Sequence, residues 1–167
     1  MSTHRQPPMN QANPAFLLAQ VGGHAATRFA ERTAELGLHP PDVGLLRMIA
    51  TRPGLSQRAL AEDLGVVPSR VVTLIDGLEK KGLVERRRST EDRRHHELHL
   101  SPVGAQALHA VREVATAHQA DLLAALTPAQ CAQLTELLTL VAEEQGLTPG
   151  VHPGYRRLPK APPAPKD

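Results

Sequence analysis

Arginine, lysine and hydroxyl side chains are concentrated in the middle of this 167-residue chain. Residues 70–94 hold eight Lys or Arg and five acidic residues, a net charge of +3, whereas residues 97–148 carry a net charge of −5. Guanidinium groups form ion pairs with phosphates and bidentate hydrogen bonds with guanine edges, and hydroxyl groups bind either partner. The pattern predicts a basic surface that binds nucleic acid, attached to an acidic body.

The candidate contact residues form two groups. Contacts to base edges and backbone are expected from Ser69, Arg70 and Thr73, with Arg70 pairing with guanine O6 and N7. For Ser69 the alternative is a turn residue without a base contact. Sequence-independent phosphate contacts are expected from Arg86, Arg87, Arg88 and Arg93. Ser56 and Pro68, which begin the two helices described next, are also expected to contact DNA.

Two short helices and a tight turn position the first group. Ser56 caps a helix that ends at Leu64, and Gly65 opens the turn. Pro68 begins the second helix, because its missing N–H is not needed in a first turn. Its apolar face comprises Val71, Leu74, Ile75 and Leu78, and the helix ends at Gly82. A Ser, Thr or Asp cap is expected before Pro68, but Val67 stands there. The arrangement is a helix-turn-helix.

Two strand candidates and a polar loop follow the second helix. Residues 83–87 and 97–100 are the strands, and residues 88–94 form the exposed loop between them. A basic loop on two strands directly after a recognition helix is typical of a wing. The helix is expected to enter the major groove, and the wing to reach phosphates or the adjoining minor groove.

These motifs resemble the MarR family of bacterial winged-helix regulators. The similar segments are Leu60-Ala61, Leu64-Gly65, the run LEKKGLVER at residues 78–86, Asp92-Arg93-Arg94 and LHLSPVG at residues 98–104. The resemblance implies a mainly α fold: a winged helix-turn-helix with a two-stranded wing, flanked by N- and C-terminal dimerisation helices. It also implies that Arg94 is the principal wing contact with DNA and that Asp92 orients Arg94 or the loop.

The flanking segments complete the expected organisation. Residues 1–12 are predicted to be a disordered arm, residues 13–147 the winged-helix domain, and residues 148–167 a Pro-rich, basic, disordered tail. Within the domain, residues 40–101 form the DNA-binding head, and residues 13–37 and 102–146 the dimerisation helices. In the MarR family such helices interdigitate between two protomers. The resemblance therefore implies a homodimer and a palindromic operator whose half-sites lie roughly 34–36 Å apart. The alternative is a monomer that buries these apolar stripes intramolecularly.

Many MarR-like proteins bind small aromatic acids or other lipophilic effectors between the dimer helices and the head. The resemblance makes His24, Arg28 and Arg47 candidates for such a pocket. No metal site and no cofactor are expected, because the nine histidines are scattered and lack a completing thiolate or acid. The alternatives are a zinc-responsive regulator, or a redox-responsive one that uses Cys131, which is otherwise expected to be a buried structural residue.

The sequence as a whole predicts a regulator rather than an enzyme, since no paired carboxylates, Gly-rich phosphate loop or nucleophile motif is visible. The absence of a long apolar run and of a signal peptide, together with a single cysteine, predicts a cytoplasmic chain without a membrane segment. The expected function is sequence-specific DNA binding as a dimeric repressor that a small-molecule effector releases. Non-specific DNA coating and a winged helix used for protein contact remain the alternatives.

Overall fold

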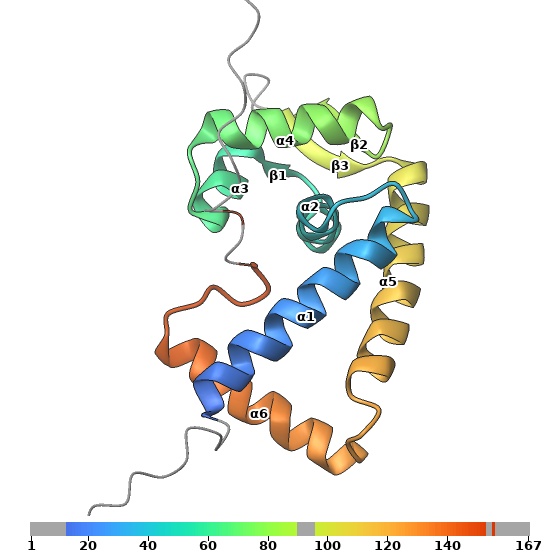
Figure 1. Ribbon diagram of the computed structural model, residues 1–167. Coiled ribbons are helices and arrows are strands. Elements are labelled where there is room, and N and C mark those ends of the chain that lie inside the picture. Colours follow the sequence, from blue (N-terminus) through green and yellow to red (C-terminus); the bar gives the residue numbers. More distant parts are fainter. Residues whose placement is uncertain (1–12, 90–95, 153–154, 156–167) are drawn as a thin grey trace, which may run out of the picture.

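The computed structural model describes residues 13–89, 96–152 and 155. Figure 1 shows a head of short elements from which two long helices lead to a third at their far end. In chain order the elements are α1 (Pro14–Ala34), α2 (Pro40–Thr51), β1 (Leu55–Ser56), α3 (Gln57–Leu64), α4 (Pro68–Lys80), β2 (Val84–Arg88), β3 (His96–Leu100), α5 (Pro102–Leu122) and α6 (Pro128–Glu144). The mainly α winged-helix fold is confirmed.

Side-chain caps fix the starts of several helices where the sequence predicts them. The side chains of Asn13, Ser56 and Thr127 accept hydrogen bonds from backbone N–H groups in the first turns of α1, α3 and α6. Helix α4 begins at Pro68 without a side-chain cap at Val67, as its sequence indicates. Gly65 ends α3 with φ +63°, a left-handed conformation that glycine adopts without strain.

The sheet has three antiparallel strands in the order β1-β3-β2, so it contains one strand, β1, besides the two predicted for the wing. In the wing, β2 pairs with β3 from Val84↔Leu100 to Arg88↔His96. The additional strand β1 pairs Leu55 with Leu98 on the other edge of β3. A strand of two residues is too short to show alternation, so no period-2 signal marks it in the sequence.

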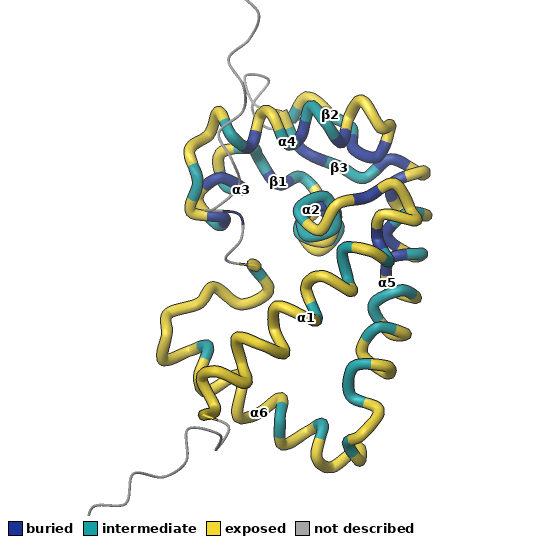
Figure 2. The backbone as a smooth tube through the Cα atoms, in the orientation of Figure 1, coloured by how far each residue is buried: buried dark blue, intermediate teal, exposed yellow. Residues whose placement is uncertain are grey.

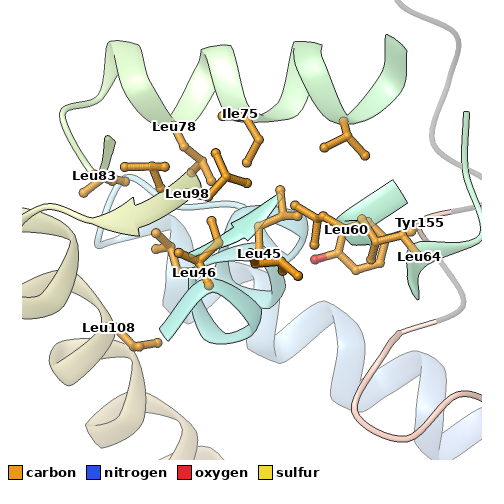
Figure 3. Packing of buried hydrophobic residues seen from close by; sticks show 14 of the residues in the cluster. Leu45, Leu46, Leu60, Leu64, Ile75, Leu78, Leu83, Leu98, Leu108 and Tyr155 are labelled. Atoms are coloured by element: carbon orange, nitrogen blue, oxygen red, sulfur yellow. The ribbon is translucent and has the colours of Figure 1, made fainter. Parts of the chain in front are cut away.

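The core of the head lies where α2, α3, α4 and β3 meet (Figure 3). Leu45, Leu60, Ile75 and Leu98 are completely buried there. They come from four different elements, so burial of these side chains fixes the recognition helix relative to the wing.

Burial falls sharply outside the head, as Figure 2 shows. Helix α6 buries no residue, and α1 buries only Thr33. Large apolar side chains are exposed along both helices: Phe16, Leu17, Leu18, Val21, Leu137, Leu138, Leu140 and Val141. Such apolar faces are typical of surfaces that bind another chain. No helix in the described parts of the chain is long and apolar enough to cross a membrane.

Part of the segment predicted to be disordered, residues 148–152 and Tyr155, is described by the structure and returns to the head. The chain turns back from α6 to the head, and Tyr155 is only 6% exposed. Its hydroxyl donates a hydrogen bond to the carbonyl oxygen of Pro41 at 2.6 Å. Composition predicts disorder here because prolines are frequent, but burial of one aromatic ring in the core holds Tyr155 against the head. The predicted N-terminal arm, residues 1–12, and residues 156–167 lie outside the described residues.

Candidate nucleic-acid interface

Helix α4 presents a polar surface opposite its buried face. Val71, Ile75 and Leu78 pack into the head, while Ser69 and Thr73 are exposed. The Thr73 hydroxyl donates to the carbonyl oxygen of Ser69 at 3.2 Å, and its oxygen can still accept a hydrogen bond from a base. Both side chains are therefore available to a DNA groove.

The other predicted residues near the start of the recognition helix occupy different environments. Pro68 is exposed at the first position of α4, and Arg70 is half-buried two residues further on. Ser56 is half-buried, and its hydroxyl oxygen accepts from the N–H of Ala59 at 3.1 Å. A hydroxyl that accepts one hydrogen bond can still donate another, so the cap leaves Ser56 able to bind a phosphate.

Arg86 lies inside a polar network that joins the wing to the recognition helix. Its guanidinium pairs with Asp76 at 2.5 Å and also with Glu79, both on α4. With the Gln57 amide oriented to satisfy both groups, its oxygen accepts from Arg86 Nη2 and Nε at 2.9 and 2.7 Å. The Arg86 side chain is 22% exposed. Two carboxylates already neutralise this cation, so the structure favours a structural role for Arg86 over the predicted phosphate contact.

The remaining basic residues of the wing differ from Arg86. Arg88 is exposed at the end of β2, whereas Arg87 pairs with Glu85 at 3.0 Å. Arg88 therefore remains the best-supported phosphate contact among the described wing residues. The predicted wing residues Arg93, Arg94 and Asp92 lie outside the described residues.

A histidine on the return strand of the wing has a local partner. His99 Nε2 lies 3.2 Å from Glu97 Oε2, with both side chains on the same side of β3. Hydrogen bonds from Ser89 and His99 hold the pKa of the Glu97 carboxyl below its ordinary value. The Glu97 carboxylate therefore binds the His99 imidazole on this side of the wing.

The three predicted effector residues do not line one pocket. Arg28 lines a cavity of about 390 Å³ between α1 and α5, together with Arg32 and Val114. Arg47 lines a separate cavity of about 400 Å³ beside α2, where its guanidinium donates to the carbonyl oxygen of Gly150. His24 is exposed and lines neither of these two cavities. Neither of these two cavities brings the three residues together, and a pocket formed by all three stays a prediction.

The α1–α5 cavity is lined by charges of both signs, with Glu31 and Glu35 beside Arg28 and Arg32. Arg32 pairs with Asp121 across the two helices, and the Phe29 and His118 rings lie with their centroids 5.5 Å apart. Burial lowers the pKa of the His118 imidazole, and the positive charge of Arg32 lowers it further. The one signal for this site in the sequence is the four-residue spacing of Arg28 and Arg32, which places both side chains on the same face of a helix.

Within the described residues, no group of three or more His, Cys, Asp or Glu is arranged to hold a metal ion. Cys131 is half-buried in the first turn of α6 rather than buried as expected. The partial exposure of Cys131 follows from its position on α6, a helix that buries no residue within the chain.

The arrangement defines a winged-helix protein whose recognition helix carries the exposed Ser69 and Thr73 and whose wing carries the exposed Arg88. A family model described as "MarR family" matches residues 38–96. A putative transcriptional regulatory protein for the hcr operon of Thauera aromatica is 34% identical over 161 residues, covering 89% of this chain and 97% of that protein. The chain belongs to the MarR family of transcriptional regulators.

Solved structures agree with this assignment. The MarR family protein Rv2887 of Mycobacterium tuberculosis, in complex with salicylic acid, has a TM-score of 0.63 and 30% identity, and the match covers 79% of this chain and 98% of that one. The transcriptional repressor CouR bound to a 23-mer DNA duplex has a TM-score of 0.69 and 28% identity, with 78% and 92% coverage.

Proposed function

We propose that this regulator is a repressor that binds a palindromic operator as a homodimer. The observation that carries the proposal is the exposed polar face of α4, with Ser69 and Thr73 outward, beside the exposed Arg88 of the wing. A rigid helix with short polar side chains fits the major groove, and a cation at its side fits the phosphate backbone. The complex of its relative CouR with duplex DNA supports the same use of this fold.

The binding test compares the gene's own upstream region with a shuffled duplex by fluorescence anisotropy at several salt concentrations. We expect the upstream DNA to bind at least about a hundredfold more tightly. Arg70→Ala should reduce that preference, and Arg94→Ala should weaken binding to both duplexes. Arg112→Ala, which removes an exposed cation from α5 outside the head, is the matched control. Equal, strongly salt-dependent binding to both duplexes would indicate a DNA-coating protein, and no binding would indicate a protein-contact module.

The homodimer is proposed from the open apolar faces of α1 and α6. Leu140 is 63% exposed on α6. Burying a leucine of this kind stabilises by about 1.5–3 kcal/mol, and a buried unpaired carboxylate costs more. Leu140→Glu is therefore expected to shift the protein from dimer to monomer in sedimentation velocity. Val103→Glu, on the exposed side of α5 close to the head, is the control that should remain dimeric.

The effector is proposed to be a small organic anion with an apolar part, bound in the α1–α5 cavity. Arg28 and Arg32 line this cavity, and Val114 supplies an apolar wall. Arg28 pairs with Glu31 and Arg32 with Asp121, so the effector anion is proposed to compete with these exposed carboxylates for the guanidinium groups. The salicylic acid complex of Rv2887 and the p-coumaroyl-CoA complex of CouR show that relatives bind such compounds. Salicylate is the first probe: it should release operator DNA from the native protein and fail to release it from Arg28→Gln. Release from both proteins would refute this site.

A further inference from the structure

The segment after α6 is attached to the head by several independent contacts. We call residues Thr148–Val151 and Tyr155 the strap. Arg47 donates a hydrogen bond from α2 to the carbonyl oxygen of Gly150. Val151 packs against the hydrophobic core of the head. Tyr155 is buried within the same cluster as Leu45 and Leu60, as Figure 3 shows.

A specific socket on α2 accepts the Tyr155 ring. A Cβ at Gly44 would lie 2.1 Å from the Tyr155 hydroxyl oxygen, so only glycine leaves room for the ring at this position of the helix. The Tyr155 hydroxyl group donates a hydrogen bond to the carbonyl oxygen of Pro41, about one turn before Gly44, at 2.6 Å. Glycine in a helix interior costs stability relative to alanine, and here the ring fills the space that it leaves. Socket and ring are thus complementary in shape and in hydrogen bonding.

The strap connects two parts of the molecule that are otherwise weakly joined. Helix α6 buries no residue within the chain, and it is not among the closely packed pairs of elements that the structure describes. Its N-terminal end continues from α5, and its C-terminal end leads into the strap (Figure 1). The docked strap therefore attaches the C-terminal end of α6 directly to α2 of the head.

We propose that the strap holds the head in a fixed position relative to α6 and that Tyr155 is its positioning residue. This inference rests on the proposed function, because α6 is there part of the dimer interface. Fixing each head relative to that interface fixes the separation of the two recognition helices. A dimer with docked straps discriminates among half-site spacings, whereas a dimer with released straps tolerates several.

Docking is measurable without DNA, because Tyr155 is the only tyrosine and the chain has no tryptophan. Burial raises the pKa of the Tyr155 phenol, the negative charge of Asp42 raises it further, and Arg47 acts in the opposite direction. Alkaline absorbance titration should therefore show a phenol that resists ionisation well above pH 10 in the native protein. In Gly44→Ala, which blocks the socket and keeps the tyrosine, the phenol should ionise near its usual value of about 10. Circular dichroism at each pH verifies that the fold persists.

The positioning role is tested with the native operator and two duplexes whose half-sites are one base pair closer or farther. We expect the native protein to prefer its own spacing by at least about tenfold, and Gly44→Ala and Tyr155→Ala to reduce that preference below about threefold. Tyr155→Phe keeps the ring and loses only the bond to Pro41, so it should stay close to the native protein. The salt dependence should be the same for all four proteins, because no phosphate contact changes.

The outcomes separate the two proposals. A native phenol that ionises near pH 10 would show that the strap is not docked in solution, and the inference would be wrong whatever the DNA results. A protected phenol with unchanged spacing preference in both disrupting variants would refute the positioning role. If the native protein shows no operator preference at all, the proposed function fails and the positioning role fails with it, while the titration still decides whether the strap is docked.

Discussion

Replacing Arg86 by Gln distinguishes a structural role from a phosphate contact, because the two roles predict different salt dependences. In the structure Arg86 pairs with two carboxylates, Asp76 and Glu79, which are 48% and 40% exposed. Partly exposed pairs contribute about 0.5–1 kcal/mol each, so the loss of both lowers the free energy of unfolding by about 1–2 kcal/mol. The network binds no phosphate, so the slope of log K against log salt concentration should not change. A phosphate contact would contribute about 0.9 to that slope.

The assay combines urea unfolding with DNA titrations at four salt concentrations. Arg88→Gln is the matched control, since it lies two residues along the same strand and is exposed. It should leave stability unchanged and reduce the salt slope by about 0.9. Asp76→Asn breaks the same network from the acidic side and should resemble Arg86→Gln in both measurements. If Arg86→Gln instead reduces the slope like Arg88→Gln and leaves stability unchanged, the structural role is refuted.

Three further predictions concern stability. Gly104→Ala places a Cβ 1.9 Å from the carbonyl oxygen of Leu83 and should lower the free energy of unfolding in urea by about 2–3 kcal/mol. Gly77→Ala, in open space on α4, should raise it by up to about 1 kcal/mol. Equal effects of the two substitutions would contradict the packing described. Leu98→Ala empties a fully buried site and should cost about 2–5 kcal/mol, which would also lower the melting temperature. Burial lowers the folded-state pKa of His118, so its contribution to stability is complete above the unfolded value of about 6.5 and is lost as the pH falls below it. The free energy of unfolding, measured between pH 7.5 and 5.5, should fall with decreasing pH in the native protein and fall less in His118→Gln.

Local signals in the sequence were sufficient for the helix-turn-helix and the two strands of the wing. The helix start at Ser56, the left-handed turn at Gly65 and the proline that begins α4 depend on neighbours within four residues. The apolar spacing of α4 and the alternation in β3 identify which side of each element is buried. Because these features are local, their residue types alone determined a helix-turn-helix followed by a wing.

Contacts between distant parts of the chain decided the rest. Arg86 has the same residue type as Arg88, and only the approach of β2 to α4 places two carboxylates beside one of them. Tyr155 lies in a Pro-rich segment, yet its partner Pro41 is 114 residues away. The two-residue strand β1 exists only because β3 offers an edge to it. A sequence specifies local conformation through neighbouring residues, but which charge is neutralised and which ring is buried depends on the three-dimensional packing of elements far apart in the chain.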